Sequence, residues 1–322
     1  MLWNRNEEGR RTENFKGLTV IECGHCYNRW RVDTRVSPSK VISSIKPFKG
    51  PRDVEYYRKR GLYEEMGLPV EIREADFEKY KQYEPYIGIM KNFSDEVCRG
   101  LKKGNAVLIP TGYCAYAPAI AGGIQRALGT DKKIGVVWID AHADNRVVET
   151  SELEEVRLVG IPVSAMAGQT MEKWRKEACG LEIPCEGKNI LASDLRMTDE
   201  EFERNKKAAG LIHLTAAEFE DEERWKTAVS ELAGRVDVIY LSVDADILRA
   251  EDIPAYEKYV PEGHTIACVS RNIQIVMETG KVVAYSLFCI DFDHYEKGGE
   301  RMYESGRCLL SAGIGKWKRI ST

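Results

Sequence analysis

The sequence predicts an α/β fold with three layers, in which helices cover both faces of a mainly parallel central sheet. The first observation behind this prediction is the alternation of short apolar runs with longer segments of helical period, which is typical of βαβ units. The second is that acidic clusters directly follow two of the apolar runs. Sites in open parallel sheets form at the carboxyl ends of strands, so these clusters fit the predicted sheet.

Each expected element is a residue range with one of these two patterns. The expected strands are 18–23, 106–110, 134–139, 189–192, 211–214, 236–243 and 282–290. The expected helices are 76–103 with an interruption at Pro85, 115–128, 163–178, 199–209 with Thr198 as N-cap, 216–232, 265–278 and 301–314. Residues 1–17 are charged and lack an apolar period, which predicts a flexible arm before a single domain at 18–322.

Composition limits the classes of partner. The 322-residue chain has 47 basic and 51 acidic residues and no basic stripe, which argues against nucleic acid or an anionic membrane as partner. No apolar run approaches the roughly 18 residues of a membrane-spanning helix, and residues 1–16 do not resemble a signal peptide. The nine cysteines, an odd number, predict a cytoplasmic protein with free thiols.

The strand at 134–139 leads directly into Asp140, His142 and Asp144. Residues two apart on an extended segment project to the same side, so the three side chains would leave the strand end together. Two carboxylates and an imidazole suit Mn, Fe or Zn.

The strand at 236–243 ends in the same way, with Asp244 and Asp246. Acidic residues also follow strands as helix caps or turn formers, so either motif alone is a weak indication of metal binding. Asp140 and Asp244 lie about a hundred residues apart at the ends of two strands of one predicted sheet. Together, the two motifs predict a two-metal centre with bridging carboxylates.

The segments at 138–144 (WIDAHAD) and 241–246 (LSVDAD) resemble the two signature motifs of the ureohydrolases: arginase, agmatinase, formiminoglutamase and relatives. The resemblance extends to 160–163, 260–265 and 289–293, and it covers about 18–317. It implies an arginase-like fold and hydrolysis of a C–N bond in a guanidino, amidino or formimino compound by metal-activated hydroxide. It also implies a small-molecule substrate and a homo-oligomer.

The resemblance further implies two sets of metal ligands: Asp140, His142, Asp244 and Asp246 for one ion, and Cys114, Asp140, Asp144 and Asp244 for the other. Cys114 stands where these enzymes carry a histidine. A thiolate binds Zn or Fe well and Mn poorly. The expected cofactor is therefore a divalent metal, manganese first, with one or two ions per chain and Zn or Fe left open by Cys114.

Other roles also come from the resemblance. Asp291 would hold the cationic group of the substrate, and Asp144 would accept a proton from the hydroxide and pass it to the leaving amine. Val159 stands where arginases have a proton-shuttle histidine, so His264, with His294 or His25 as alternatives, is the candidate replacement.

Arg146 and Arg157 map near the positions that hold the substrate's α-carboxylate in arginase. They would suit an acidic group, unless both are solvated loop arginines. L-Arginine is therefore not the expected substrate.

Two other functions remain open. Cys114 and Val159 would also fit a catalytically inactive arginase-fold protein that acts as a binding or regulatory subunit. Alternatively, Cys114 could serve a single-metal or thiol-dependent hydrolase as ligand or nucleophile, which requires a lowered thiol pKa. Cys23-Gly24-His25-Cys26 could be a redox or zinc motif, but a loop at the rim of the site fits better, because no second Cys-x-x-Cys follows.

Overall fold

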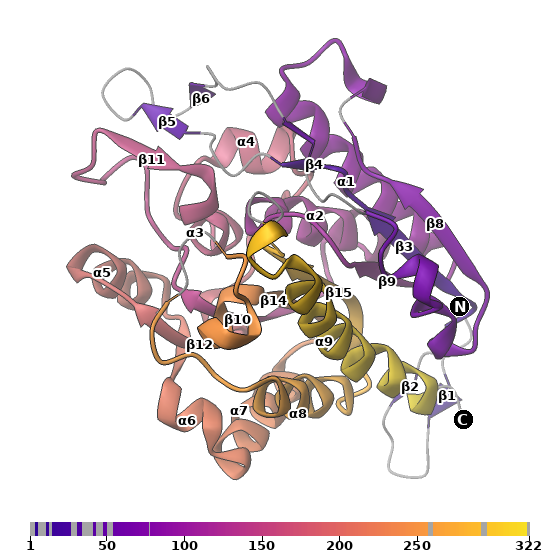
Figure 1. Cartoon of the computed structure of the whole chain (residues 1–322). Coiled ribbons are helices and arrows are strands. Elements are labelled where there is room, and N and C mark those ends of the chain that lie inside the picture. Colours follow the sequence, from indigo (N-terminus) through magenta and orange to yellow (C-terminus); the bar gives the residue numbers. More distant parts are fainter. Residues whose placement is uncertain are drawn as a thin grey trace.

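The computed structural model describes residues 4–5, 11–12, 15–26, 31–33, 41–42, 48–49, 54–76, 78–256, 260–290 and 295–320. Its centre is an eight-stranded sheet in the order β13-β12-β10-β14-β15-β9-β3-β8, and every neighbouring pair is parallel. Helices cover both faces of this sheet (Figure 1), so the predicted three-layer α/β fold is confirmed.

The strands of the central sheet are β3 (Leu18–Glu22), β8 (Val70–Glu74), β9 (Ala106–Ile109), β10 (Ile134–His142), β12 (Ile190–Met197), β13 (Ile212–Thr215), β14 (Val238–Asp244) and β15 (Val282–Phe288). Short antiparallel pieces lie outside it: β1 (Asn4–Arg5) with β2 (Arg11–Thr12), β4 (His25–Cys26) with β7 (Phe48–Lys49), and β5 (Arg31–Asp33) with β6 (Val41–Ile42) and β11 (Glu155–Arg157).

The helices are α1 (Pro85–Lys102), α2 (Ala117–Leu128), α3 (Pro162–Met166), α4 (Glu172–Glu177), α5 (Glu200–Ala209), α6 (Ala216–Glu220), α7 (Glu222–Arg235), α8 (Ile266–Met277) and α9 (Gly299–Ile320). Figure 1 shows α1 to α4 on one side of the sheet and α6 to α9 on the other. Each side has its own apolar core, the first around Phe93 and Trp174 and the second around Trp225 and Trp317.

Several predicted boundaries were wrong for local reasons. The helix expected at 163–178 is divided into α3 and α4, because Gly168 and Met171 adopt left-handed conformations between them. The helix expected at 216–232 is interrupted at Asp221, which caps α7. Asp199, and not Thr198, caps α5. Strand β8 was not predicted, since its sequence VEIRE alternates with charged residues at the sheet edge.

The predicted N-terminal arm lies largely outside the described residues. Within it, Phe15 packs edge-on against Trp317 of α9, with ring centroids 6.3 Å apart. The Lys16 amide donates to the carbonyl oxygen of Gly104 at 2.8 Å. Residues 15–17 are therefore attached to the domain and are not part of a free arm. Cys23 is fully buried, whereas the side chains of His25 and Cys26 lie outside the described part.

The strand order places the site. Strands β10, β14, β15 and β9 are consecutive neighbours in the sheet, although they come from distant parts of the sequence. Because the strands are parallel, their carboxyl ends lie at one edge. The residues that follow these four strands are thereby brought together.

Candidate metal centre

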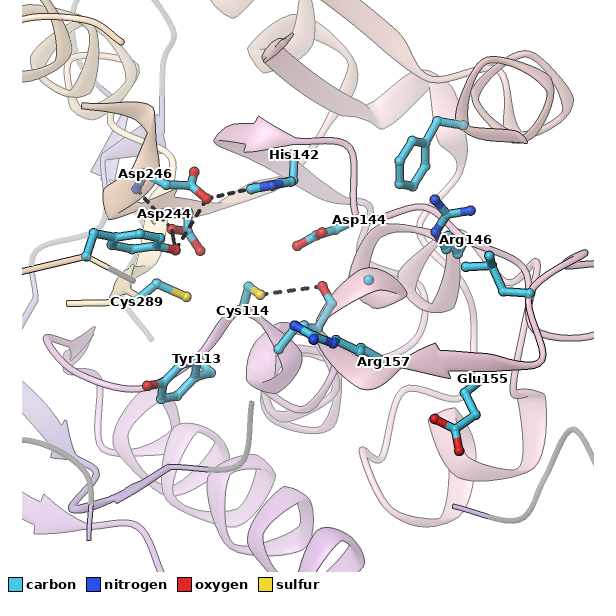
Figure 2. Close-up of a pocket in the computed structure, with 15 residues that line it drawn as sticks. Tyr113, Cys114, His142, Asp144, Arg146, Glu155, Arg157, Asp244, Asp246 and Cys289 are labelled. Carbon is cyan, nitrogen blue, oxygen red and sulfur yellow. Dashed lines mark hydrogen bonds and ion pairs between the residues drawn. The ribbon is translucent and has the colours of Figure 1, made fainter. Parts of the chain in front are cut away.

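A cavity of about 400 Å³ lies at this edge of the sheet (Figure 2). It is lined by Tyr113, Cys114, His142, Asp144, Arg146, Leu153, Glu155, Arg157, Val159, Gly160, Phe202, Asp244, Asp246, Tyr256 and Cys289. The two acidic motifs therefore meet in one cavity, as the sequence predicted.

Asp140, His142 and Asp246 form the first cluster of ligand groups, with the candidate ligand atoms all within 4.8 Å of one another. Nδ1 of His142 lies 2.7 Å from Oδ2 of Asp246, and the His142 amide donates to Oδ1 of Asp140 at 2.6 Å. Oδ2 of Asp140 is buried and has no hydrogen-bond partner among the described residues. An ionised oxygen in that position fits a bound cation.

Cys114, Asp244 and Cys289 form the second cluster, again within 4.8 Å. All three are buried, and both cysteines are free thiols. The thiol of Cys114 donates to the carbonyl oxygen of Val159 at 3.5 Å. Cys289 was missed as a site residue, because the sequence comparison assigned the end of this strand to Asp291. Its place directly after an apolar strand was the available signal.

Asp144 lines the cavity beside these residues (Figure 2) and belongs to neither tight cluster. Its φ of 43° is in the left-handed region, which is uncommon for a residue other than glycine. Burial raises the pKa of Asp144 to about 7, although His142 opposes the rise. A carboxylate with that pKa can exchange a proton near neutral pH.

Crowded carboxylates dominate the electrostatics of the centre. Burial and the neighbouring carboxylates raise the pKa of Asp140 and of Asp244 well above the usual range. Burial alone would lower the pKa of His142, but hydrogen bonds to Asp140 and Asp246 raise it to about 12. One imidazolium thus faces four buried acidic side chains, and a divalent cation would relieve that imbalance.

The Cys114 thiol does not have the properties of an activated nucleophile. Hydrogen bonding to Cys289, burial and the charge of Asp144 raise the pKa of Cys114 well above its ordinary value. A cysteine nucleophile requires the opposite shift. Without a bound metal, the thiol-dependent alternative therefore lacks this requirement.

Tyr256 is a further site residue that sequence reasoning missed. Its hydroxyl donates to Oδ1 of Asp244 at 3.5 Å and to Oδ2 of Asp246 at 3.3 Å. Tyr256 therefore contacts one carboxylate from each cluster. No motif surrounds this residue, and only the folded chain places it in the cavity.

His264 does not occupy the position expected of a proton shuttle. It is buried outside the cavity lining, with Nδ1 2.9 Å from Glu220 and Nε2 3.2 Å from Asp194. Asp194 also forms an ion pair with Arg196. Arg196 donates to the backbone carbonyl of Asp246 at 3.2 Å. The geometry therefore gives His264 a supporting position behind Asp246 instead of the predicted catalytic one.

The two predicted substrate-binding arginines differ in their contacts. Arg146 pairs with Glu201 at 2.5 Å and Asp199 at 2.6 Å, so its guanidinium is already engaged. Arg157 is an exposed residue of β11 that lines the cavity, and no acidic partner is found for it among the described residues. Only Arg157 is placed to receive a ligand's acidic group. Asp291, predicted to hold the substrate's cationic group, lies outside the described residues.

The fold and the site define a class: a three-layer α/β protein with a carboxylate-rich centre at the carboxyl edge of a parallel sheet. Comparison with known proteins identifies the family. The family sequence model of the arginase family matches residues 21–291 of this chain. Because this match spans most of the chain, the chain belongs to the arginase family.

Individual relatives are distant. An arginase of Emericella nidulans is 21% identical over 313 residues, covering 92% of this chain and 94% of that protein. A formimidoylglutamase of Citrobacter koseri is 25% identical over 155 residues, covering 48% and 44%. The solved structure of Entamoeba histolytica arginase in complex with L-ornithine aligns with a TM-score of 0.73 at 17% identity, covering 94% of this chain and 99% of that one. In the described part of the chain, no helix is long and apolar enough to cross a membrane.

Proposed function

We propose that the protein is a metal-dependent hydrolase of the ureohydrolase type, which cleaves a C–N bond in a guanidino, amidino or formimino compound. The observation that supports this most strongly is the convergence of both acidic motifs at one cavity, beside which Asp140 has an oxygen with no hydrogen-bond partner in the described part of the chain. Membership of the arginase family supports the same reaction class.

A bound divalent ion would supply the nucleophile by lowering the pKa of a water molecule. Asp140, His142, Asp244 and Asp246 would hold the first ion, and their oxygen and nitrogen donors suit manganese as well as iron or zinc. Asp144 would accept a proton from the nucleophile and pass it to the leaving amine, a role that its position in the cavity lining allows. Asp291 would hold the cationic end of the substrate.

We propose a small substrate that carries an acidic group, which Arg157 would bind at the cavity mouth. The engaged contacts of Arg146 argue against a direct role for that residue. We expect that L-arginine is not the preferred substrate, and formimino compounds belong in the first screen. Assembly as a homo-oligomer and a cytoplasmic location remain predictions.

The test is metal content by elemental analysis, after chelation and reloading with Mn, Zn or Fe, followed by a screen of guanidino, amidino and formimino compounds. We expect bound metal and turnover, both lost in His142→Ala. Asp131→Asn, a change in an exposed loop, is the matched control. Failure to bind metal under any loading would contradict the proposal and favour the alternative, a catalytically inactive binding or regulatory subunit.

A further inference from the structure

The ligand groups of the centre divide into two sets of different chemistry. Asp140, His142 and Asp246 offer oxygen and nitrogen, whereas the cluster of Cys114, Cys289 and Asp244 offers two sulfurs and one carboxylate. We call these the carboxylate half and the thiol half. Soft thiolate ligands select zinc, copper(I) and iron centres, and Mn²⁺ prefers harder donors. The two halves are therefore suited to different ions.

The thiol half is built by neighbouring strands. The chain after β9 stays alongside the chain after β15, since the Cys289 amide donates to the Gly112 carbonyl at 2.9 Å. Asp244 is in register with Phe288, the residue just before Cys289. The backbone of Cys289 has a φ of 60°, a left-handed conformation that is rare without glycine and is typical of functional positions. Figure 2 shows the Cys114 and Cys289 sulfurs both directed into the cavity.

The presence of Cys289 changes which metal site Cys114 can contribute to. A single cysteine in place of a histidine would weaken a manganese site without creating another. A second cysteine whose sulfur lies within 4.8 Å of the first, with a carboxylate at the same distance, supplies three of the four ligands of a tetrahedral zinc site. The fourth position would remain open to water or substrate, as in catalytic zinc sites.

We propose that Cys114, Cys289 and Asp244 form a thiolate site for a zinc-class cation, beside a carboxylate half that prefers manganese. Each thiol gives up its proton to solvent when the ion binds. The inference rests on the proposed metal-dependent function, because it assigns the ion of one half of that centre. Its test does not use activity.

Cobalt(II) is the probe, because it replaces zinc and shows near-ultraviolet charge-transfer absorption when thiolates bind it. The full-length protein is freed of metal, reduced, and titrated with Co²⁺ under anaerobic conditions. We expect a thiolate–cobalt band that Zn²⁺ removes and Mn²⁺ does not. The band should be partly lost in Cys114→Ser and in Cys289→Ser, and fully lost in the double variant.

Cys308→Ser is the matched control, because this half-buried cysteine of α9 does not line the cavity. A measurement on the unaltered protein avoids any folding defect of the variants: Zn²⁺ should protect Cys114 and Cys289, but not Cys308, from alkylation read by mass spectrometry. Absence of the band and of protection in the reduced protein would overturn the inference, as would a band that survives in the double variant.

The outcomes separate this inference from the proposed function. Hydrolysis with manganese but no thiolate–cobalt band would leave the proposed function standing and remove the thiolate site. A thiolate–cobalt band without any hydrolysis would leave the thiolate site standing and remove the proposed function.

Discussion

The carboxylate half and the thiol half of the centre differ in how the chain builds them. Asp140 and His142 lie at the end of one strand and Asp246 follows its neighbour, so two short motifs supply the whole cluster. Cys114 and Cys289 are single residues after two strands that lie 175 positions apart in sequence (289 − 114). The comparison teaches that two short motifs indicate one half of the centre, whereas Cys289 joins the other half only because of the strand order.

The two halves are also connected by hydrogen bonds. Asp244 belongs to the thiol cluster, and its Oδ1 accepts a hydrogen bond from the Asp246 amide at 3.1 Å. Tyr256 contacts both carboxylates. Changes at Asp244 or Tyr256 should therefore affect both halves, whereas a change at a residue that contacts only one half should mainly affect that half.

The largest expected effect follows from removing a ligand of the carboxylate half. Asp140→Asn should lower Mn²⁺ affinity by more than about 100-fold, because replacing groups outside the ligand shell already costs 10–100-fold. The thiolate–cobalt band should remain. Calorimetric titration of Mn²⁺ measures the first effect, with Asp131→Asn as control. Unchanged Mn²⁺ affinity would contradict the assignment, and loss of the cobalt band would show that the halves are inseparable.

The supporting position of His264 predicts an effect on stability. His264→Ala leaves buried Asp194 with one partner fewer, which should lower the free energy of unfolding by about 1–3 kcal/mol. Urea denaturation measures this change. His213→Ala is the comparison, because His213 contacts Lys206 at 3.0 Å and the backbone oxygen of Asp194 at 3.2 Å, and no contact to the Asp194 carboxylate is found in the described part of the chain. The pH–rate profile of His264→Ala should keep the same acidic and basic limbs as the unaltered enzyme. Loss of one limb would instead support His264 as a proton shuttle.

Tyr256→Phe tests the connection between the halves. The hydroxyl contacts Asp244 and Asp246 at long hydrogen-bond distances, so we expect about a 10-fold loss of affinity, the low end for groups behind metal ligands. Tyr256→Phe should weaken the binding of both Mn²⁺ and Co²⁺, whereas Asp140→Asn should weaken the binding of Mn²⁺ and leave the cobalt band in place. Tyr83→Phe, an exposed substitution, should alter neither. An effect confined to one half would mean that Tyr256 supports only that half.

The smallest effect is expected at the cavity mouth, away from both halves. Arg157→Ala should raise KM for an acidic substrate about fivefold, because an exposed ion pair contributes about 1 kcal/mol. Metal binding should not change. Arg204→Ala on the exposed side of α5 is the control. If Arg146→Ala raised KM while Arg157→Ala did not, the assignment of the two arginines would be reversed.

The structure brings predicted site residues together where they are close in sequence. Asp140, His142 and Asp144 were predicted because they alternate along one segment, and Asp244 and Asp246 repeat the pattern. In the folded chain, Asp244 and Asp246 nevertheless belong to different clusters, and Asp144 belongs to neither. Arg146 was misjudged, because its partners Asp199 and Glu201 lie more than fifty residues away and nothing near Arg146 indicates them. His264 was misjudged for the same reason, since Glu220 and Asp194 belong to other elements.

The sequence by itself determined the three-layer α/β fold, the family, and the carboxylate half, because hydrophobic period and residue spacing are local properties of the chain. Only the tertiary structure decided that Cys289 faces Cys114, that Tyr256 joins the two halves, and that Arg146 is already paired. These facts depend on which strands become neighbours: β15 lies between β14 and β9 in the sheet, although β9 precedes β14 by more than a hundred residues in the chain. Packing of the whole chain sets that order, and no short segment encodes it.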